Sequence, residues 1–191
     1  IDELKSFLYK NINQWGPSWG VHSLVTIQRQ TMSRILYYEK LYKKIIGVPG
    51  SILEFGVQWG ATLSQLISLR GMYEPYNYRR HIYGFDTFDG LLNVSEEFDG
   101  EFVKNRDYST FTGYEEELEK ILTIHEKNNP ISHIKKFSLI KGDILETFPI
   151  WLEENPHSIV SMAIFDLDIY EPTKKTLELV LPKLTKGSLI V

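Results

Sequence analysis

Four acidic residues lie at the ends of apolar segments that have the composition of buried strands. They are Glu54, Asp86, Asp143 and Asp166. A lone acid at such a place is usually a solvated loop residue. The carboxyl ends of parallel strands meet at one edge of a sheet, so four acids there are expected to lie together. This pattern favours a cationic or hydroxyl-rich ligand that lies across the strand ends.

Two glycines follow the first of these strands, in the segment EFGVQWG at residues 54–60. Gly56 would let the backbone approach a ligand, and Gly60 would let the next helix start tightly. The dinucleotide fingerprint G-x-G-x-x-G lacks its middle glycine here. The Glu54 carboxylate would repel a pyrophosphate, but it suits an ammonium group or a polar amino-acid tail. The alternative is a glycine turn that only joins a strand to a helix.

Asp86 and Asp143 have the residue type and position of nucleoside-binding groups. Asp86 could accept hydrogen bonds from both ribose hydroxyls, with Thr87 beside it. Asp143 could accept from the exocyclic amine of adenine, with the amide of Ile144 near the ring nitrogen. Aspartate is also a favoured N-cap, so either residue could instead cap the following helix. This alternative is strongest for Asp143.

Asp166 and Asp168, in FDLDIYEP, form the most suggestive pair. Alternation along a strand would place both side chains on the same side. Two close carboxylates repel each other unless a cation or a proton lies between them, and Mg²⁺ often takes only one or two protein oxygens. The pair could therefore bind a metal or polarise a substrate hydroxyl. The alternative for Asp168 is that it caps the helix that follows Pro172.

Strand and helix patterns alternate from residue 51 to the end, which predicts an α/β fold with a doubly wound, Rossmann-like parallel sheet. Residues 1–48 are expected to form an N-terminal helical segment, and residues 49–191 the ligand-binding domain. EPYNYRR, residues 74–80, is interpreted as a polar linker. The sequence stops in GSLIV, a fifth strand, so the last strands of the fold are expected to be missing.

The segment at residues 87–113 has no sustained period and contains three glycines, several acids and five aromatic residues. A connection of this length inside a compact domain is usually a functional lid or is disordered. We expect a lid that selects the substrate, because its aromatic and acidic residues suit a sugar or polyol.

Composition limits the classes of function. The 191 residues carry a net charge of −4, which argues against a broad nucleic-acid-binding surface. The absence of cysteine excludes disulfides and thiolate metal sites, and weakly favours a cytoplasmic location. No apolar run is long enough to span a membrane, so no membrane partner is expected. The N-terminal helices, with Trp15 and Trp19, could pack on a partner subunit in a homo-oligomer or simply cover the sheet.

Four segments, in order, resemble those of class I S-adenosylmethionine-dependent methyltransferases, and more narrowly the macrocin-type (TylF/MycF) sugar O-methyltransferases. These segments are VPGSILEFGVQWGATL, HIYGFDTFDGL, LIKGDILETFP and AIFDLDIYEPTKKTLELVLPKLTKGSLIV. The similarity covers about residues 30–191. One departure is Leu167 in FDLD, where the family usually has glycine.

The resemblance implies a role for each matching position. The methionine part of S-adenosylmethionine would lie against Glu54, Gly56, Gly60 and Thr62. The ribose would lie at Asp86 and Thr87, and the adenine at Asp143 and Ile144. Asp166 would be a Mg²⁺ ligand near the transferred methyl group, with Asp168 beside it as a catalytic residue. In this family the remaining metal ligands follow the fifth strand, where this sequence stops.

The implied reaction is an in-line transfer of a methyl group to a sugar hydroxyl, assisted by Mg²⁺. The sequence does not single out a general base. Two alternatives remain at this point. A nicotinamide-dependent Rossmann oxidoreductase would share the ribose acid, but it would need the complete glycine fingerprint. A non-catalytic binding module with the same fold is the second alternative.

Overall fold

The computed structural model describes residues 2–92 and 94–191, and it divides the chain into two units, Ile1–Lys40 and Leu41–Val191. The first unit contains short helices: α1 (Asp2–Asn11), η1 (Ile12–Gln14), η2 (Gly16–Ser18), α2 (Trp19–His22) and η3 (Ser23–Thr26). Helix α3 (Arg29–Ile45) crosses into the second unit. Among the described residues, no helix is long and apolar enough to cross a membrane.

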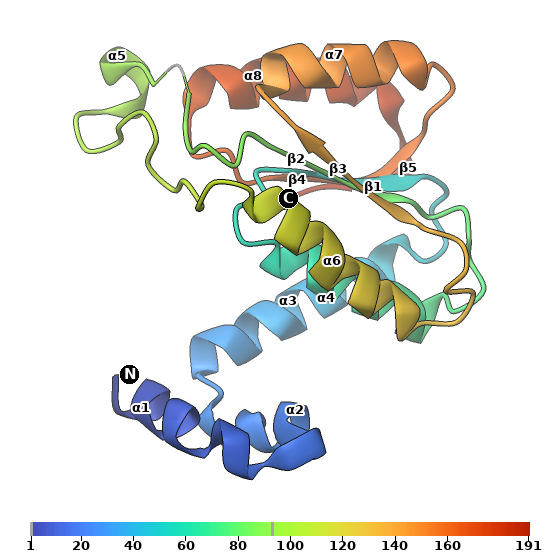
Figure 1. Cartoon of the computed structure of the whole chain (residues 1–191). Coiled ribbons are helices and arrows are strands. Elements are labelled where there is room, and N and C mark those ends of the chain that lie inside the picture. The colour runs from blue at the N-terminus through green and yellow to red at the C-terminus, as the bar shows by residue number, and fades with distance from the viewer. Residues whose placement is uncertain (1, 93) are drawn as a thin grey trace. The chain divides into compact units, whose positions relative to one another are not determined.

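The second unit is built on a five-stranded parallel sheet in the order β3-β2-β1-β4-β5 (Figure 1). The strands are β1 (Ser51–Phe55), β2 (Ile82–Asp86), β3 (Phe137–Lys141), β4 (Val160–Phe165) and β5 (Leu184–Ile190). The chain adds β2 and β3 on one side of β1, and β4 and β5 on the other. The strand order therefore reverses between β1 and β4. This arrangement confirms the doubly wound Rossmann-like fold expected from the sequence.

Helices cover both faces of the sheet (Figure 1). Helices α4 (Ala61–Tyr73) and α6 (Tyr114–Lys127) lie on one face, and α7 (Ile144–Glu154) and α8 (Tyr170–Val180) on the other. A 3-10 turn, η4 (Leu181–Lys183), joins α8 to β5. Beneath α7 and α8, the alternating side chains of β1 enter an apolar core. That core includes Leu53, Phe55, Phe85, Phe148, Trp151 and Val160.

The long connection after β2 folds back on itself rather than running freely. Leu91 exchanges backbone hydrogen bonds with residues 106 and 107, and Thr110 donates to the Phe88 carbonyl. Phe88 is buried, and the short helix α5 (Glu96–Asp99) lies at the far end. Residue 93 of the expected lid at residues 87–113 lies outside the described residues. Within the described residues, these hydrogen bonds join the two arms of the segment.

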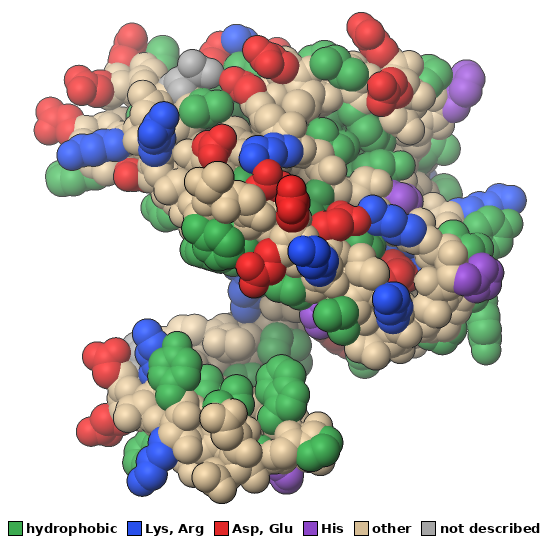
Figure 2. All heavy atoms as spheres, in the orientation of Figure 1, with side chains coloured by type: hydrophobic (Ala, Val, Ile, Leu, Met, Phe, Trp, Pro, Cys, Tyr) green, Lys and Arg blue, Asp and Glu red, His purple; other side chains and the backbone are tan. Residues whose placement is uncertain are grey.

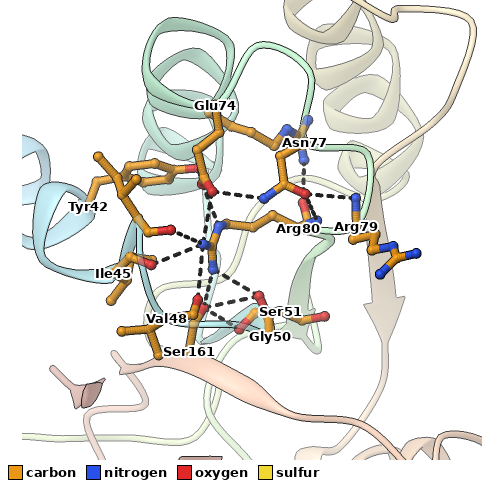
Figure 3. Close-up of polar contacts among 12 residues, drawn as sticks. Tyr42, Ile45, Val48, Gly50, Ser51, Glu74, Asn77, Arg79, Arg80 and Ser161 are labelled. Carbon is orange, nitrogen blue, oxygen red and sulfur yellow. Dashed lines mark hydrogen bonds and ion pairs between the residues drawn. The ribbon is translucent and has the colours of Figure 1, made fainter. Parts of the chain in front are cut away.

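A buried arginine joins several elements at the amino ends of the strands (Figure 3). Arg80 pairs with Glu74, and its guanidinium donates to the Gly50 carbonyl at 2.9 Å and to Ser161 Oγ at 2.8 Å. It also donates to the carbonyls of Ile45 and Val48. Burial acts to raise the pKa of Glu74, but hydrogen bonds from Arg80, Tyr42 and Asn77 outweigh it and lower that pKa. The segment interpreted as a polar linker is therefore a structural junction.

Side chains of both charge signs are mixed over the visible surface of the second unit, as Figure 2 shows. Ion pairs contribute to this pattern, including Lys141 with Glu115 and Lys175 with Glu171. Such exposed pairs contribute little to stability, on the order of 0 to 1 kcal/mol each.

Candidate active site

The ends of β1 and β4 meet at the point where the strand order reverses, the usual place for a ligand in such sheets. The Asp166 amide donates to the Phe55 carbonyl at 2.8 Å, and the Gly56 amide donates to the Phe85 carbonyl at 2.9 Å. Gly56 has a φ of +91°, and a Cβ there would lie 2.0 Å from the Asp166 carbonyl oxygen. Only glycine fits this junction without displacing the end of β4.

The Asp86 carboxylate organises the loop that follows β1. Its Oδ2 accepts the amides of Val57 at 2.6 Å and Gln58 at 2.8 Å, and its Oδ1 accepts the amide of Phe88 at 2.6 Å. Gln58 stands where the dinucleotide fingerprint has its middle glycine, and its φ is +48°. The backbone therefore adopts the left-handed turn without glycine, at a typical cost of 1 to 3 kcal/mol, roughly. The charge-assisted hydrogen bonds from Val57 and Gln58 help to hold that turn.

The same geometry leaves Asp86 able to bind a further donor. A carboxylate oxygen accepts about two hydrogen bonds, roughly one for each lone pair. Oδ2 accepts two hydrogen bonds from the loop amides, whereas Oδ1 accepts one from the Phe88 amide. Asp86 is half-buried, so Oδ1 is the oxygen suited to a ribose hydroxyl.

The other residues expected at the methionine end are more enclosed than the sequence indicated. Glu54 lies inside β1, one residue before its end, and is 2% exposed. Thr62 is buried in the first turn of α4. Gly60 has a φ of +72°, and a Cβ there would lie 2.4 Å from Leu118 Cδ1. Gly60 therefore lets α4 and α6 approach each other, which is a packing role.

Asp143 is an N-cap. Its Oδ1 accepts the Leu145 amide at 2.9 Å at the start of α7, as the capping alternative requires. The Gly142 amide donates to the Asp86 carbonyl at 3.0 Å, so this turn lies directly beside Asp86. Ile144 is buried at 7% exposure. Thr87 uses its hydroxyl within its own turn, donating to the Gly90 carbonyl at 2.6 Å.

The structure corrects two expectations about Asp168. Strand β4 ends at Phe165 and Asp168 has a φ of +58°, so strand alternation does not orient the pair with Asp166. Helix α8 begins at Tyr170 with Ile169 as the N-cap residue, so Asp168 is not the cap. Partial desolvation raises the pKa of the Asp168 carboxyl, and the charge of Asp166 raises it further. The two carboxylates are therefore close enough to repel each other.

This exposed pair is the part of the edge that suits a divalent cation. Within residues 2–92 and 94–191, no group of three or more His, Asp or Glu side chains is placed to hold a metal ion. Mg²⁺ often binds through one or two carboxylates and keeps several waters. Asp166 and Asp168 fit that smaller requirement, and a bound cation would remove their mutual repulsion.

An open pocket of about 390 Å³ lies beside Asp168. Its lining combines apolar side chains with one carboxylate, one ammonium group and one exposed tyrosine. The lining residues are Phe165, Leu167, Asp168, Ile169, Tyr170, Thr173, Lys174 and Leu177. None of Tyr170, Thr173 and Lys174 was singled out from the sequence. Thr173 and Lys174 were expected only as the first residues of a helix after Pro172, and Tyr170 lay before that expected start.

An aromatic cluster at the glycine loop was also not foreseen. Trp59 lies 4.8 Å from Tyr114 and 6.2 Å from Phe111, measured between ring centroids. The Tyr114 hydroxyl donates to the Trp59 carbonyl at 3.1 Å. These contacts join the loop after β1 to the end of the 87–113 segment. They span about fifty residues of sequence, so no local pattern could have indicated them.

Comparison with solved structures places this chain close to one enzyme. The crystal structure of CalS11, a calicheamicin methyltransferase, matches with a TM-score of 0.90 and 38% identity, over 99% of this chain and 76% of that one. The apo structure of CalS11, a TDP-rhamnose 3'-O-methyltransferase of calicheamicin biosynthesis, matches with a TM-score of 0.81 and 36% identity, over 99% and 75% of the two chains.

The O-methyltransferase NovP is more distant, with a TM-score of 0.66 and 22% identity over 82% of this chain and 62% of that one, and this likeness shows the fold alone. No protein-family model matches the sequence, and a search of curated proteins finds no match.

Proposed function

The chain belongs to the family of sugar O-methyltransferases that includes CalS11, and we propose that it transfers a methyl group from S-adenosylmethionine to a hydroxyl of a sugar or a glycosylated small molecule. The family assignment confirms the resemblance seen in the sequence and excludes the nicotinamide-dependent alternative. The methyl donor, the acceptor and the assistance by Mg²⁺ are the proposed parts. The macrocin-type subfamily also belongs to the proposal.

The observation that supports this proposal best is the continuous contact across the carboxyl edge. Backbone hydrogen bonds run from Asp166 to Phe55, from Gly56 to Phe85 and from Gly142 to Asp86. Four segments expected to bind the cofactor and the acceptor are thereby held side by side. Such fixed positions are what a group transfer needs, because orientation removes much of the entropic barrier.

We assign the roles as follows. The methionine portion lies toward Glu54, Gly56, Gly60 and Thr62, and the ribose at Asp86 Oδ1 beside Thr87. The adenine lies along the turn at Asp143 and Ile144. S-adenosylmethionine supplies a methyl group on a sulfonium centre. Asp166 and Asp168 bind the acceptor end, where they orient a hydroxyl and, with Mg²⁺, make it more acidic.

The direct test is turnover by the purified enzyme. S-adenosylmethionine is offered with a panel of nucleotide-linked sugars and sugar-bearing small molecules, with either Mg²⁺ or a chelator. We expect S-adenosylhomocysteine to form together with a product heavier by one methyl group, and the chelator to slow the reaction. Methylation that is unaffected by the chelator would remove Mg²⁺ from the proposal. Binding of S-adenosylhomocysteine without turnover of any sugar would support the non-catalytic alternative instead.

A further inference from the structure

The short helix α5 fastens onto the beginning of α8. Asp99 Oδ1 accepts the Tyr170 amide at 2.7 Å, and Asp99 Oδ2 accepts the Ser95 amide at 2.8 Å. The first amides of a helix have no partner within the helix, and the N-cap side chain usually accepts one of them. The N-cap residue of α8, Ile169, has no such side-chain hydrogen bond. Asp99 therefore supplies this acceptor from a segment 71 residues away.

An aromatic contact reinforces the same junction. The rings of Phe98 and Tyr170 are stacked, with 5.2 Å between centroids and 23° between planes. Figure 1 shows α5 next to the beginning of α8, and Figure 2 shows acidic side chains gathered over this part of the surface. Phe98 is 57% exposed and Tyr170 47% exposed. The stack therefore holds α5 against α8 while both rings stay partly exposed to solvent.

The 87–113 segment limits how far α5 can move. Hydrogen bonds between Leu91 and residues 106 and 107 tie its two arms together. Closer to the tip, the Val94 amide donates to Asn105 Oδ1 at 3.0 Å. Near the base, Phe88 is buried and its carbonyl accepts both the amide and the hydroxyl of Thr110. The arm is thus a folded projection, and α5 at its tip reaches α8 at a fixed place.

The turn that Asp99 holds is also a wall of the open pocket. Asp168, Ile169 and Tyr170 all line that pocket. Asp168 has the strained left-handed conformation, so its side-chain direction depends on how the next two residues are held. A sugar could place a hydroxyl at Asp168 and an apolar ring face on Tyr170. The hydrogen bond from the Tyr170 amide to Asp99 therefore also fixes the positions of the pocket residues that would contact the acceptor.

We propose that Asp99 and Phe98 are positioning residues that clasp α5 to the α8 N-terminus and so fix the acceptor pocket around Asp168 and Tyr170. This inference rests on the proposed function, because the pocket is an acceptor site only in a methyltransferase. Asp99 and Phe98 take no part in the chemical step. Their loss lowers the affinity for the acceptor and leaves the proposed cofactor site, at the ends of β1, β2 and β3, intact.

The test compares Asp99→Ala with the matched control Glu97→Ala, an exposed acid in the same helix. Asp99→Ala is expected to raise the KM for the acceptor by about tenfold, the effect of losing one charge-assisted hydrogen bond. The affinity for S-adenosylhomocysteine, measured by calorimetry, stays unchanged. Asp99→Asn keeps an amide oxygen as acceptor and restores much of the loss. Phe98→Ala shifts the KM in the same direction, and Glu97→Ala leaves it at the wild-type value.

A second readout needs no turnover. Hydrogen exchange of the Tyr170 amide is expected to be faster in Asp99→Ala than in the wild type and in Glu97→Ala. Equal protection of Tyr170 in all three proteins would overturn the clasp, whatever the activity. In an active enzyme, a wild-type acceptor KM in Asp99→Ala would overturn its role in binding. The remaining outcome is that the Tyr170 amide exchanges faster in Asp99→Ala, as expected, but the wild type methylates no sugar. That outcome would overturn the proposed function, and with it the acceptor role of the pocket.

Discussion

Asp86 combines a structural contribution with the proposed cofactor contact, because its carboxylate already accepts three backbone amides. Asp86→Ala is expected to lower the free energy of unfolding by about 1 to 3 kcal/mol, since buried amides lose their acceptor. It is also expected to weaken binding of S-adenosylhomocysteine by about tenfold or more, through loss of the ribose contact. Chemical denaturation and calorimetry measure the two effects separately.

Asp89→Ala serves as the control for this prediction, because it removes an exposed acid three residues away. Asp89→Ala should change neither the free energy of unfolding nor the affinity for S-adenosylhomocysteine appreciably. A variant Asp86→Ala that is less stable but binds S-adenosylhomocysteine with wild-type affinity would show that Asp86 only shapes the loop. The ribose assignment would then be wrong.

The position of His81 shows that this histidine is not a general base for the proposed reaction. It precedes β2 at the amino end of the sheet, away from the candidate site, and its ring lies 2.9 Å from Ser138 Oγ. Burial, together with the positive charges of Arg70 and Lys135, lowers the pKa of His81 from its ordinary 6.5 to about 4. The histidine is therefore neutral at physiological pH and structural.

The lowered pKa of His81 predicts a pH dependence of stability. The unfolded chain takes up the proton near pH 6.5 and the folded protein only near pH 4, so protonation favours unfolding between these values. The stabilisation is present above pH 6.5, and about 3 kcal/mol of it is lost as the pH falls to 4. Unfolding free energies measured from pH 7 to 4 should show the wild type losing stability relative to His81→Gln, because the glutamine does not titrate. A constant difference across this range would contradict the prediction.

At the scale of elements, a comparison of Gly56 with Gly113 distinguishes two reasons why a glycine is needed: close packing and backbone conformation. Both have positive φ, +91° and +83°, but a Cβ at Gly56 meets the Asp166 backbone whereas Gly113 has open space around it. Gly113→Ala should cost about 1 kcal/mol, from the left-handed conformation alone. Gly56→Ala should cost at least about 3 kcal/mol and weaken cofactor binding, because the ends of β1 and β4 must separate. Equal losses of stability in the two variants would refute the close junction of β1 with β4.

Sequence periodicity predicted the helices well and the strand ends less well. The residue patterns after Gly60 and Gly113 predict helices over 61–73 and 114–127, and the structure has helices with these bounds. In 114–127 the apolar side chains also repeat at helical spacing. The alternation expected for Asp166 and Asp168 requires the fourth strand to continue to Asp168, but β4 ends at Phe165 and Asp168 has a left-handed conformation. Non-glycine residues with positive φ have little local signature. Gln58 and Asp168, both in the candidate site, have this conformation.

At the scale of the whole molecule, strand and helix order was enough to predict the sheet and the edge where the acids meet. It could not show which side chains each acid contacts. The capping role of Asp143 was one of two open alternatives, and the amides held by Asp86 come from another loop. Contacts such as Asp99 with Tyr170 or Arg80 with Ser161 join residues 71 and 81 positions apart. They follow from the three-dimensional arrangement, so a single sequence contains no local pattern for them.

The Arg80 junction gives the strongest prediction at this scale, because one buried guanidinium holds carbonyls from the α3–β1 connection, the Ser161 hydroxyl of β4 and the Glu74 carboxylate. Arg80→Met should lower the free energy of unfolding by about 3 to 5 kcal/mol, since it leaves a buried carboxylate without its cation. Arg79→Met is the matched control, because Arg79 is exposed, and it should lie within about 0.5 kcal/mol of the wild type.

The double variant Arg80→Met with Glu74→Gln distinguishes two causes of lost stability in Arg80→Met: the unpaired Glu74 charge and the lost hydrogen bonds of Arg80. Removing the Glu74 charge should recover part of the stability lost in Arg80→Met, because the buried carboxylate is the larger cost. At temperatures below its unfolding transition, Arg80→Met should bind S-adenosylhomocysteine with wild-type affinity. The junction lies at the amino ends of the strands, whereas the candidate site lies at their carboxyl ends. Reduced affinity in fully folded Arg80→Met would mean that the sheet transmits strain between its two edges. A double variant no more stable than Arg80→Met would mean that lost hydrogen bonds, rather than charge, account for the effect.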